Sequence, residues 1–200
     1  SVFVAEELSE VLNTKVVIGR INMGLLNRII IDDVLLDDQS GQEMLKVTRL
    51  SAKFDIMPFF KGKISISSVQ LFGFNINLRK ETPDSPPNFK FVLDAFASKD
   101  TVKKENSLDL RINSILIRRG RMSYHVLSEE ETPGKFNAKH IQLQNIIANI
   151  SLKALSKDSL NLGIKRLSLD EKASGFSLKK MSLKLVANNK QTNIDNFTIE

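Results

Sequence analysis

Cysteine and tryptophan are absent from this chain of 200 residues, and tyrosine occurs once. Without cysteine the chain can form no disulfide, thiolate nucleophile or cysteine-ligated zinc site. With Tyr124 as the single tyrosine and no tryptophan, few aromatic platforms exist for stacking nucleobases or sugar rings. The composition therefore disfavours nucleic acid as a partner, and it disfavours a closed β-sandwich that binds glycans.

Long apolar runs are also missing. No stretch of roughly 18 apolar residues is present that could span a bilayer as a helix. The segment Ser1–Leu12 carries Glu6, Glu7 and Glu10 where a signal peptide needs a basic start and an apolar core. The sequence thus predicts neither a transmembrane helix nor a signal peptide within these residues.

The charge is moderately basic, with 29 Lys and Arg against 23 Asp and Glu, a net charge of +6 and a pI of about 9.5. This balance favours an anionic partner such as a phospholipid surface, although only mildly. The basic residues fall in short groups, such as Lys103-Lys104 and Lys179-Lys180, which are typical of solvated turns and strand faces.

The first half of the chain predicts one helix followed by strands. Val4, Leu8, Val11 and Leu12 recur at spacings of three and four, as in an amphipathic helix. The apolar period then changes to two, and it predicts strands at Lys15–Ile21, Ile29–Leu36, Met44–Ile56 and Lys63–Leu78. The turn formers of Asp37–Gly41 predict a hairpin turn, and phase slips near Arg49 and Ser68 predict bulges.

The second half begins with a break and then returns to strands. Arg79–Asn88 is rich in proline and charge and predicts a loop, Phe89–Ser98 predicts a second short helix, and Asp100–Ser107 predicts another loop. The remaining strands are predicted at Leu108–Arg118, Arg121–Leu127, Lys139–Leu152, Asp158–Asp170, Phe176–Ala187 and Asn193–Glu200.

These elements indicate a mainly β fold: one elongated, curved antiparallel sheet of repeated strands with one or two short amphipathic helices. Long strands in chain order, without helices between them, favour an antiparallel meander. Three segments repeat one alternating apolar theme, and we interpret residues 1–200 as a single fragment of a longer repeat array. Its parts are an N-terminal helix (1–13), a first strand group (15–79), a loop plus short helix (80–107) and a second strand group (108–200).

A search for chemistry finds no assembled site. His125 and His140 are the only histidines, on different predicted strands and without a second ligand type at a defining spacing. The neighbouring carboxylates of Asp32-Asp33 point to opposite strand faces, and Asp37–Gly41 lacks the alternating oxygen ligands of a calcium loop. Glycine-rich phosphate loops and the hydrolase nucleophile motif are absent. We therefore predict no enzyme, no catalytic residue, no cofactor and no metal site.

The order of features resembles a known family. The features are a helix, then Lys15–Gly19, Ile31–Asp38 with Gly41, Pro58–Ile66, and Asn88-Phe89 at the start of a short helix. This order resembles the N-terminal region of the TamB and AsmA-like envelope proteins of Gram-negative bacteria, most closely the Bacteroides type, over essentially the whole chain. The resemblance implies a protein that spans the periplasm, anchored to the inner membrane by a helix upstream of this region, and having an outer-membrane barrel partner through regions absent here.

The resemblance also implies an apolar groove for phospholipid transport between the inner and outer membranes. The same alternation of apolar residues would also fill the core of a β-sandwich. The candidate groove-lining residues are Ile64, Ile66, Val69, Leu71, Leu110, Ile112, Ile115, Ile117, Ile141 and Leu143. The alternative is an assembly or translocation module that aids outer-membrane protein biogenesis or secretion by pairing its sheet edges with client strands.

Overall fold

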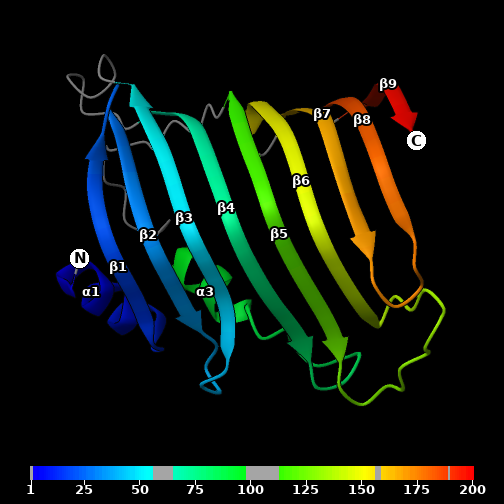
Figure 1. Cartoon of the computed structure of the whole chain (residues 1–200), viewed down its shortest axis with the longest axis horizontal. Coiled ribbons are helices and arrows are strands. Elements are labelled where there is room, and N and C mark those ends of the chain that lie inside the picture. Colours follow the sequence, from blue (N-terminus) through cyan, green and yellow to red (C-terminus); the bar gives the residue numbers. More distant parts are fainter. Residues whose placement is uncertain (1, 56–64, 98–112, 156–158, 189) are drawn as a thin grey trace.

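A computed structural model describes residues 2–55, 65–97, 113–155, 159–188 and 190–200. In this part of the chain nine strands form a single open sheet in chain order, accompanied by two short helices (Figure 1). The elements are α1 (Val2–Leu12), β1 (Val16–Gly24), β2 (Arg28–Asp37), β3 (Glu43–Asp55), β4 (Ser65–Lys80), α3 (Lys90–Ala97), β5 (Ser114–Val126), β6 (His140–Leu155), β7 (Ser159–Glu171), β8 (Ser177–Asn188) and β9 (Thr192–Ile199).

The mainly β fold is confirmed, but the sheet is mixed rather than wholly antiparallel. β4 and β5 run parallel, with Leu71 opposite Ile117, whereas every other neighbouring pair of strands is antiparallel. A parallel pair needs a long crossover. Residues 81–113, which include α3, supply it. The sequence pattern indicated this loop and helix, but the strand periodicity carries no information on strand direction.

One strand was divided wrongly by the sequence pattern. The predicted strands Leu108–Arg118 and Arg121–Leu127 form a single strand, β5, which runs through Gly120 without a turn. Residues 108–112 lie outside the described part. The charged group Arg118–Arg121 interrupts the apolar pattern, but the two flanking strands retain their pairing with β5 on either side of it.

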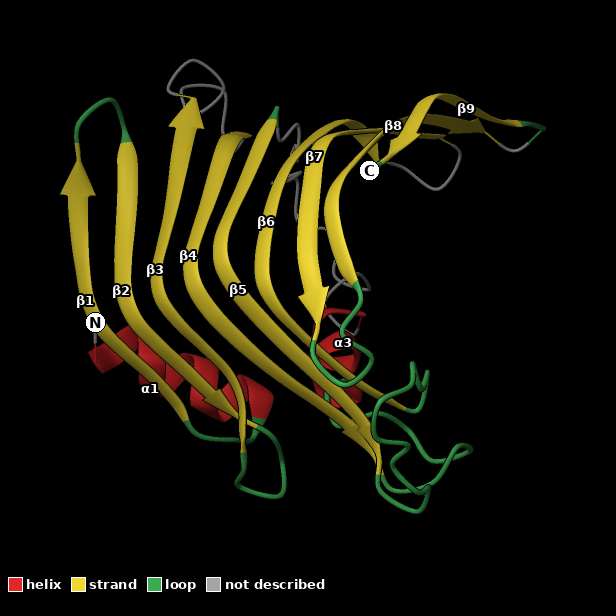
Figure 2. Ribbon diagram, turned by 45° about the vertical axis from the view of Figure 1, so that its right-hand side comes forward, coloured by secondary structure: helices red, strands yellow, loops and turns green. Residues whose placement is uncertain are grey.

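The strands bend strongly, so the sheet is curved, and both helices lie on the side toward which it curves (Figure 2). The apolar residues change phase along one line that crosses β1 to β5 and β8, and within one or two cross-strand rows of this line in β6, β7 and β9. At this line apolar residues on one face are three positions apart instead of two. The pairs are Ile18 and Ile21, Ile31 and Val34, Val47 and Leu50, Leu71 and Phe74, Ile117 and Gly120, Leu143 and Ile146, Ile164 and Leu167, and Leu178 and Met181. β9 makes the same change between Ile194 and Ile199.

Left-handed backbone conformations mark this line. The residues are Asp33 (φ 57°), Gly73 (φ 64°), Arg119 (φ 56°), Asn145 (φ 54°) and Asn196 (φ 54°). Such irregularities bend a strand and increase its local twist. They also keep apolar side chains on one face through the bend, because each slip restores the phase that the bend would otherwise reverse.

At the centre of this line, Phe74 of β4 lies over Gly120 of β5 and reaches toward Ile146 of β6. These side chains belong to a buried cluster in which Val47, Phe74 and Ile146 are each at most 8% exposed. A Cβ atom at Gly120 would lie 2.4 Å from the Phe74 ring and 3.0 Å from the Cβ of Ile146. The position therefore requires glycine for space, without any requirement for a positive φ.

Both helices pack against one end of the same face. Leu12 of α1 forms a buried cluster with Leu36 and Met44. Phe89, which precedes α3, and Val92, in its first turn, pack against the same cluster. Asn13, with φ 48°, ends α1, and its successor Thr14 donates a backbone hydrogen bond to the carbonyl of Ser9. This is a left-handed helix cap.

Asn88 fixes the start of α3. Its Oδ1 accepts a hydrogen bond from the Arg79 backbone N–H at 3.0 Å, and its Nδ2 donates to the Asn77 carbonyl at 3.1 Å and to Asp38 Oδ2 at 3.2 Å. Asp38, 2% exposed, also accepts hydrogen bonds from Ser40 and forms an ion pair with Arg79 at 2.6 Å. The predicted hairpin turn at Asp37–Gly41 thus also anchors the second helix.

We expect Gly120→Ala to destabilise the sheet by about 1–3 kcal/mol, because the added methyl group overpacks the contact between Phe74 and Ile146. Chemical denaturation should report the loss as a lower midpoint. Gly163→Ala is the matched control, since its Cβ would meet only the Ser151 hydroxyl, which can rotate away. In a Phe74→Leu background the cost of Gly120→Ala should shrink. An equal cost in both backgrounds would contradict this account.

Candidate functional site

The most extensive feature of the sheet is one apolar face, defined here as the face that carries Leu71, Ile117 and their cross-strand partners. Directly opposed residues in neighbouring strands share a face. On this face a single row of apolar side chains runs across all nine strands. The row consists of Ile21, Ile31, Leu50, Leu71, Ile117, Ala148, Leu167, Met181 and Ile199.

A second row runs parallel to the first over eight strands, on the side nearer the β1–β2 turn. It consists of Met23, Ile29, Ala52, Val69, Ile115, Ile150, Ile164 and Leu183. In most strands the residue between the two rows is polar, and the exceptions are Ile30 in β2 and Leu116 in β5. Together they make a continuous apolar surface, rather than the separate patches that nine independent strands would give.

Much of this apolar face keeps some exposure. Although 42% of the chain is hydrophobic, only ten hydrophobic side chains are buried among the described residues. In the nine-residue row Ala148 is 3% exposed, but Ile21 is 38% and Ile199 56% exposed. The helices pack against Val16, Leu36 and Leu45, which form a different cross-strand row. No member of the nine-residue row belongs to this helix-covered cluster. Within the described chain the helices therefore cover only one end of the face.

The predicted lining residues can now be placed. Val69, Leu71, Ile115 and Ile117 lie in the two rows described above. Ile141 is opposite Tyr124, and Leu143 is opposite Met122, both on the same face. Ile66 is paired with residue 54 of β3. A register shift separates this pair from the preceding ones and leaves Ile66 on the apolar face as well. Ile64, Leu110 and Ile112 lie outside the described residues.

Several residues of this face were missed by the sequence analysis. Met23, Leu183 and Met181 belong to the two rows but were not selected, although each follows the period-two pattern of its own strand. Their membership depends on the register between strands, which the period alone does not give. The phase slips could have indicated it, because each strand contains one i, i+3 apolar step.

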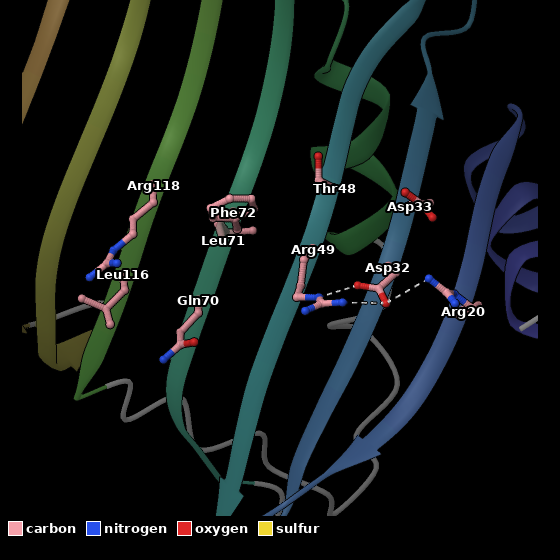
Figure 3. Close-up of a pocket in the computed structure, with 10 residues that line it drawn as sticks. All are labelled: Arg20, Asp32, Asp33, Thr48, Arg49, Gln70, Leu71, Phe72, Leu116 and Arg118. Atoms are coloured by element: carbon pink, nitrogen blue, oxygen red, sulfur yellow. Dashed lines mark hydrogen bonds and ion pairs between the residues drawn. The ribbon is translucent and has the colours of Figure 1, made fainter.

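The opposite face, called here the polar face, carries charge at its centre. Arg20, Asp32, Arg49, Phe72 and Arg118 are consecutive cross-strand neighbours on β1 to β5. They line a cavity of about 550 Å³, seen in Figure 3 from the side away from the helices. Arg20 on β1 points toward Asp32, and Arg118 lines the cavity on β5, so three arginines surround a single buried carboxylate (Figure 3).

Asp32 is the buried acid of this pocket and pairs with two of its arginines. Its carboxylate accepts hydrogen bonds from Arg49 Nε at 2.6 Å and Arg49 Nη2 at 3.1 Å, and Arg20 lies 4.0 Å away. The hydrogen bond from Arg49 is the main cause that lowers the pKa of Asp32, and the positive charges of Arg49 and Arg20 act in the same direction, against the effect of burial. Asp32 is thus ionised and already paired, and it does not form a dyad with Asp33.

Glu171, at the end of β7, is the most completely enclosed acid together with Asp38, and it is 2% exposed. Its carboxylate accepts hydrogen bonds from the Ser174 hydroxyl at 2.5 Å, from the backbone N–H groups of Ser174 at 2.7 Å and Ala173 at 3.1 Å, and from the Gln142 N–H at 3.3 Å. Burial alone would raise the pKa of Glu171, but these donors together outweigh it and lower the pKa to about 2. Glu171 therefore ties the β7–β8 turn to β6.

The two histidines lie together. His125 and His140 are directly opposed on β5 and β6, and their Nδ1 atoms are 3.0 Å apart. The sequence analysis treated them as unrelated because they are far apart in the chain. The hairpin between β5 and β6 brings them together on the polar face.

No helix among the described residues is both long enough and apolar enough to cross a membrane. No protein-family model and no curated protein sequence matches this chain. The arrangement of the apolar face, and not a named relative, is therefore the starting point for assigning a function.

We expect acid to act on stability through Glu171. Because its pKa is about 2 in the folded protein and near 4.5 when unfolded, the stabilisation is complete above pH 4.5 and is lost as the pH falls from 4.5 toward 2. At neutral pH Glu171→Gln should lower the free energy of unfolding by about 1–3 kcal/mol. Between pH 6 and pH 3 the variant should lose less stability than the parent chain.

Thermal unfolding followed by circular dichroism at a series of pH values would test this. Asp84→Asn is the control, because Asp84 is exposed in the loop after β4. If Glu171→Gln and the parent chain lose stability in parallel over this pH range, Glu171 is not the carboxyl that responds.

Proposed function

We propose that this chain is a non-catalytic, lipid-holding segment of an envelope protein, and that phospholipid acyl chains lie along its apolar face. The observation that carries the proposal is the nine-residue apolar row, which is continuous across the sheet and in part exposed. Soluble proteins rarely expose contiguous apolar surfaces of this kind unless they bind a partner there.

The dimensions of the face suit an acyl chain. Neighbouring strands lie about 4.8 Å apart, so eight steps from β1 to β9 extend about 38 Å. One leaflet of a bilayer core is about 15 Å thick, which is half of the usual 30 Å. A row of this length can therefore accompany an acyl chain over its whole extent.

The energetic requirement also fits. Exposing an acyl chain to water costs about 0.8 kcal/mol per CH₂ group, or on the order of 10 kcal/mol for a full chain. A protein that carries phospholipid must offset most of this with an apolar surface. The partly exposed side chains of the two rows provide such a surface along one direction, from Met23 and Ile21 toward Leu183 and Ile199.

The β1–β2 turn gives this face an apolar end. Met23, Leu25 and Leu26 are 76%, 89% and 77% exposed, and Met23 is the first member of the eight-residue row. Leu25, Leu26 and Asn27 form a tight three-residue turn between the paired residues Gly24 and Arg28, and Leu26 and Asn27 have positive φ angles of 58° and 57°. An apolar tip next to an apolar row is a suitable entry point for a lipid.

The resemblance to TamB and AsmA-like proteins extends the proposal. In that setting the chain lies in the periplasm, in a protein anchored to the inner membrane upstream of this region. The apolar face is then one part of a longer path by which phospholipid moves between the inner and outer membranes. The net charge of +6 is compatible with anionic headgroups that remain in solvent beside the sheet.

Photocrosslinking distinguishes a lipid surface from a packed core. We expect probes that replace Leu71 and Ile117 to form adducts with phospholipid when the chain is incubated with vesicles or isolated from cells. Probes at Gln70 and Leu116 are the matched controls, because these two residues are paired with each other between the two apolar rows and so lie on the polar face. Leu116 is the stricter control, since it is apolar but faces the other way.

Ile117→Glu should also reduce the amount of lipid that copurifies with the chain, and Leu116→Glu should leave it unchanged. Mass spectrometry of organic extracts measures the lipid, and circular dichroism shows whether each variant folds. If folded protein exposed to vesicles gives no lipid adducts at Leu71 or Ile117, the apolar face is a closed core and the proposal is wrong.

A second candidate function rests on β9. This strand has no further strand partner among the described residues, and its side chains are exposed throughout, with Ile194, Phe197 and Ile199 at 58%, 58% and 56%. A free edge can accept another strand by β-augmentation. The chain could thereby hold client strands during outer-membrane protein assembly or secretion.

If this second function holds, probes at Asn193 and Thr198 should capture client polypeptide in cells that express the full-length protein. Asn22, on edge strand β1, serves as the comparison, because β1 is flanked by α1. Capture of neighbouring segments of the same protein alone would show that β9 continues the sheet and that no client binds there.

A further inference from the structure

We propose that His125, His140 and Glu131 form a binding site for a divalent transition-metal ion of the zinc class, at the polar-face end of the β5–β6 hairpin. The three ligand atoms are two Nδ1 atoms and one carboxylate oxygen. They come from β5, from β6 and from the loop between these strands. The site is separate from the apolar face, so it does not depend on the proposed lipid function.

The histidine pair is built into the sheet. Direct cross-strand pairing places the rings with their centroids 5.3 Å apart and their planes inclined by 53°. His140 is 7% exposed, and the side chain of His125 is 24% exposed. The two rings are thus held by backbone pairing and by burial, and do not depend on a mobile surface side chain.

The second nitrogen of His140 fixes its tautomer. Nε2 lies 2.9 Å from the backbone carbonyl of Glu129, which can only accept a hydrogen bond, so Nε2 is the atom that carries the proton. In a neutral imidazole the other nitrogen then presents a lone pair, and Nδ1 of His140 directs this lone pair at His125. An N–H bonded to a backbone carbonyl is the usual outer support of a metal-binding histidine.

Glu131 completes the set. Its Oε1 lies 3.8 Å from Nδ1 of His125 and 4.0 Å from Nδ1 of His140. Two ligand atoms on a tetrahedral zinc ion, each about 2.05 Å from the metal, lie about 3.3 Å apart. Glu131 Oε1 would have to move by less than 1 Å to reach this separation, and its side chain is free to do so because it is 64% exposed.

The loop that carries Glu131 is held near the histidines. Lys139 pairs with Glu129 at 2.6 Å, and Asn137 Nδ2 donates to the Glu130 carbonyl at 3.2 Å. The backbone just before Glu129 is bonded to the end of β4, because Leu127 N–H donates to the Lys80 carbonyl at 2.9 Å and Ser128 N–H donates to the adjoining Glu81 carbonyl at 3.0 Å. A bound ion would therefore close this loop onto two strands that are already in position.

The donor set determines the class of ion. Two imidazoles suit zinc, copper and nickel, whereas magnesium and calcium prefer all-oxygen ligands. Three protein ligands leave one position for water or for a donor from a partner. Two neutral imidazoles and one carboxylate leave the bound ion with a net charge of +1, so an anionic fourth ligand is favoured.

Titration of metal-free protein without a histidine tag tests the proposal. We expect one Zn²⁺ ion to bind per chain by isothermal titration calorimetry, with no comparable binding of Mg²⁺. Addition of Co²⁺ should give the visible absorption bands of a tetrahedral complex with nitrogen and oxygen ligands. The ion should also raise the midpoint of thermal unfolding, because it binds the folded chain.

Variants separate this site from adventitious binding. Glu131→Gln should weaken Zn²⁺ binding by on the order of tenfold or more without affecting the fold, and His125→Ala should abolish the Co²⁺ bands. Glu130→Gln is the matched control, since Glu130 is an exposed neighbour whose side chain is not part of the site. No stoichiometric binding, or equal binding by the parent chain and His125→Ala, would overturn the proposal.

Discussion

The bend in this sheet and the continuity of its apolar face depend on one constraint: every strand must change phase at or close to one line across the sheet. A strand that kept a strict period of two through the bend would place half of its apolar residues on the polar face. Here each strand takes an i, i+3 step, and several use a left-handed residue to do so. The Phe74 ring over Gly120 lies on this line, so close packing and curvature meet at one contact.

The two ends of the curved apolar face differ in whether helices cover them. At one end the sheet is covered by Leu12 of α1 and by the first residues of α3. The hydrogen bonds of Asn88 to Asp38 and Asn77 hold the start of α3 in this position. Along the nine-residue row no helix contributes to the packing clusters within the described residues. A closed sandwich would cover both. This difference favours a surface that holds a ligand over a core that is complete in itself.

The polar face has its own organisation. Asp32 of β2 is paired with Arg49 of β3 and Arg20 of β1 and so forms a structural ion pair across three strands, whereas Arg118 lines the same cavity on β5. The histidine pair lies on this face, at the end of β5 and β6. The two proposed binding sites, the apolar face for lipid and the histidine site for a metal ion, therefore lie on opposite sides of a single sheet, and a change on one side need not disturb the other.

The sequence by itself determined the strand content, the N-terminal helix, the hairpin turn at Asp37–Gly41 and the alternation that makes one face apolar, because these follow from the local period and from turn residues. It also indicated the phase slip near Arg49. It could not give the parallel pairing of β4 with β5, or join the two halves of β5 across Arg119, because direction and register depend on partners that are distant in the chain. Only the tertiary structure placed His125 beside His140 and Met23 in one row with Leu183, since cross-strand neighbours carry no common signal along the sequence.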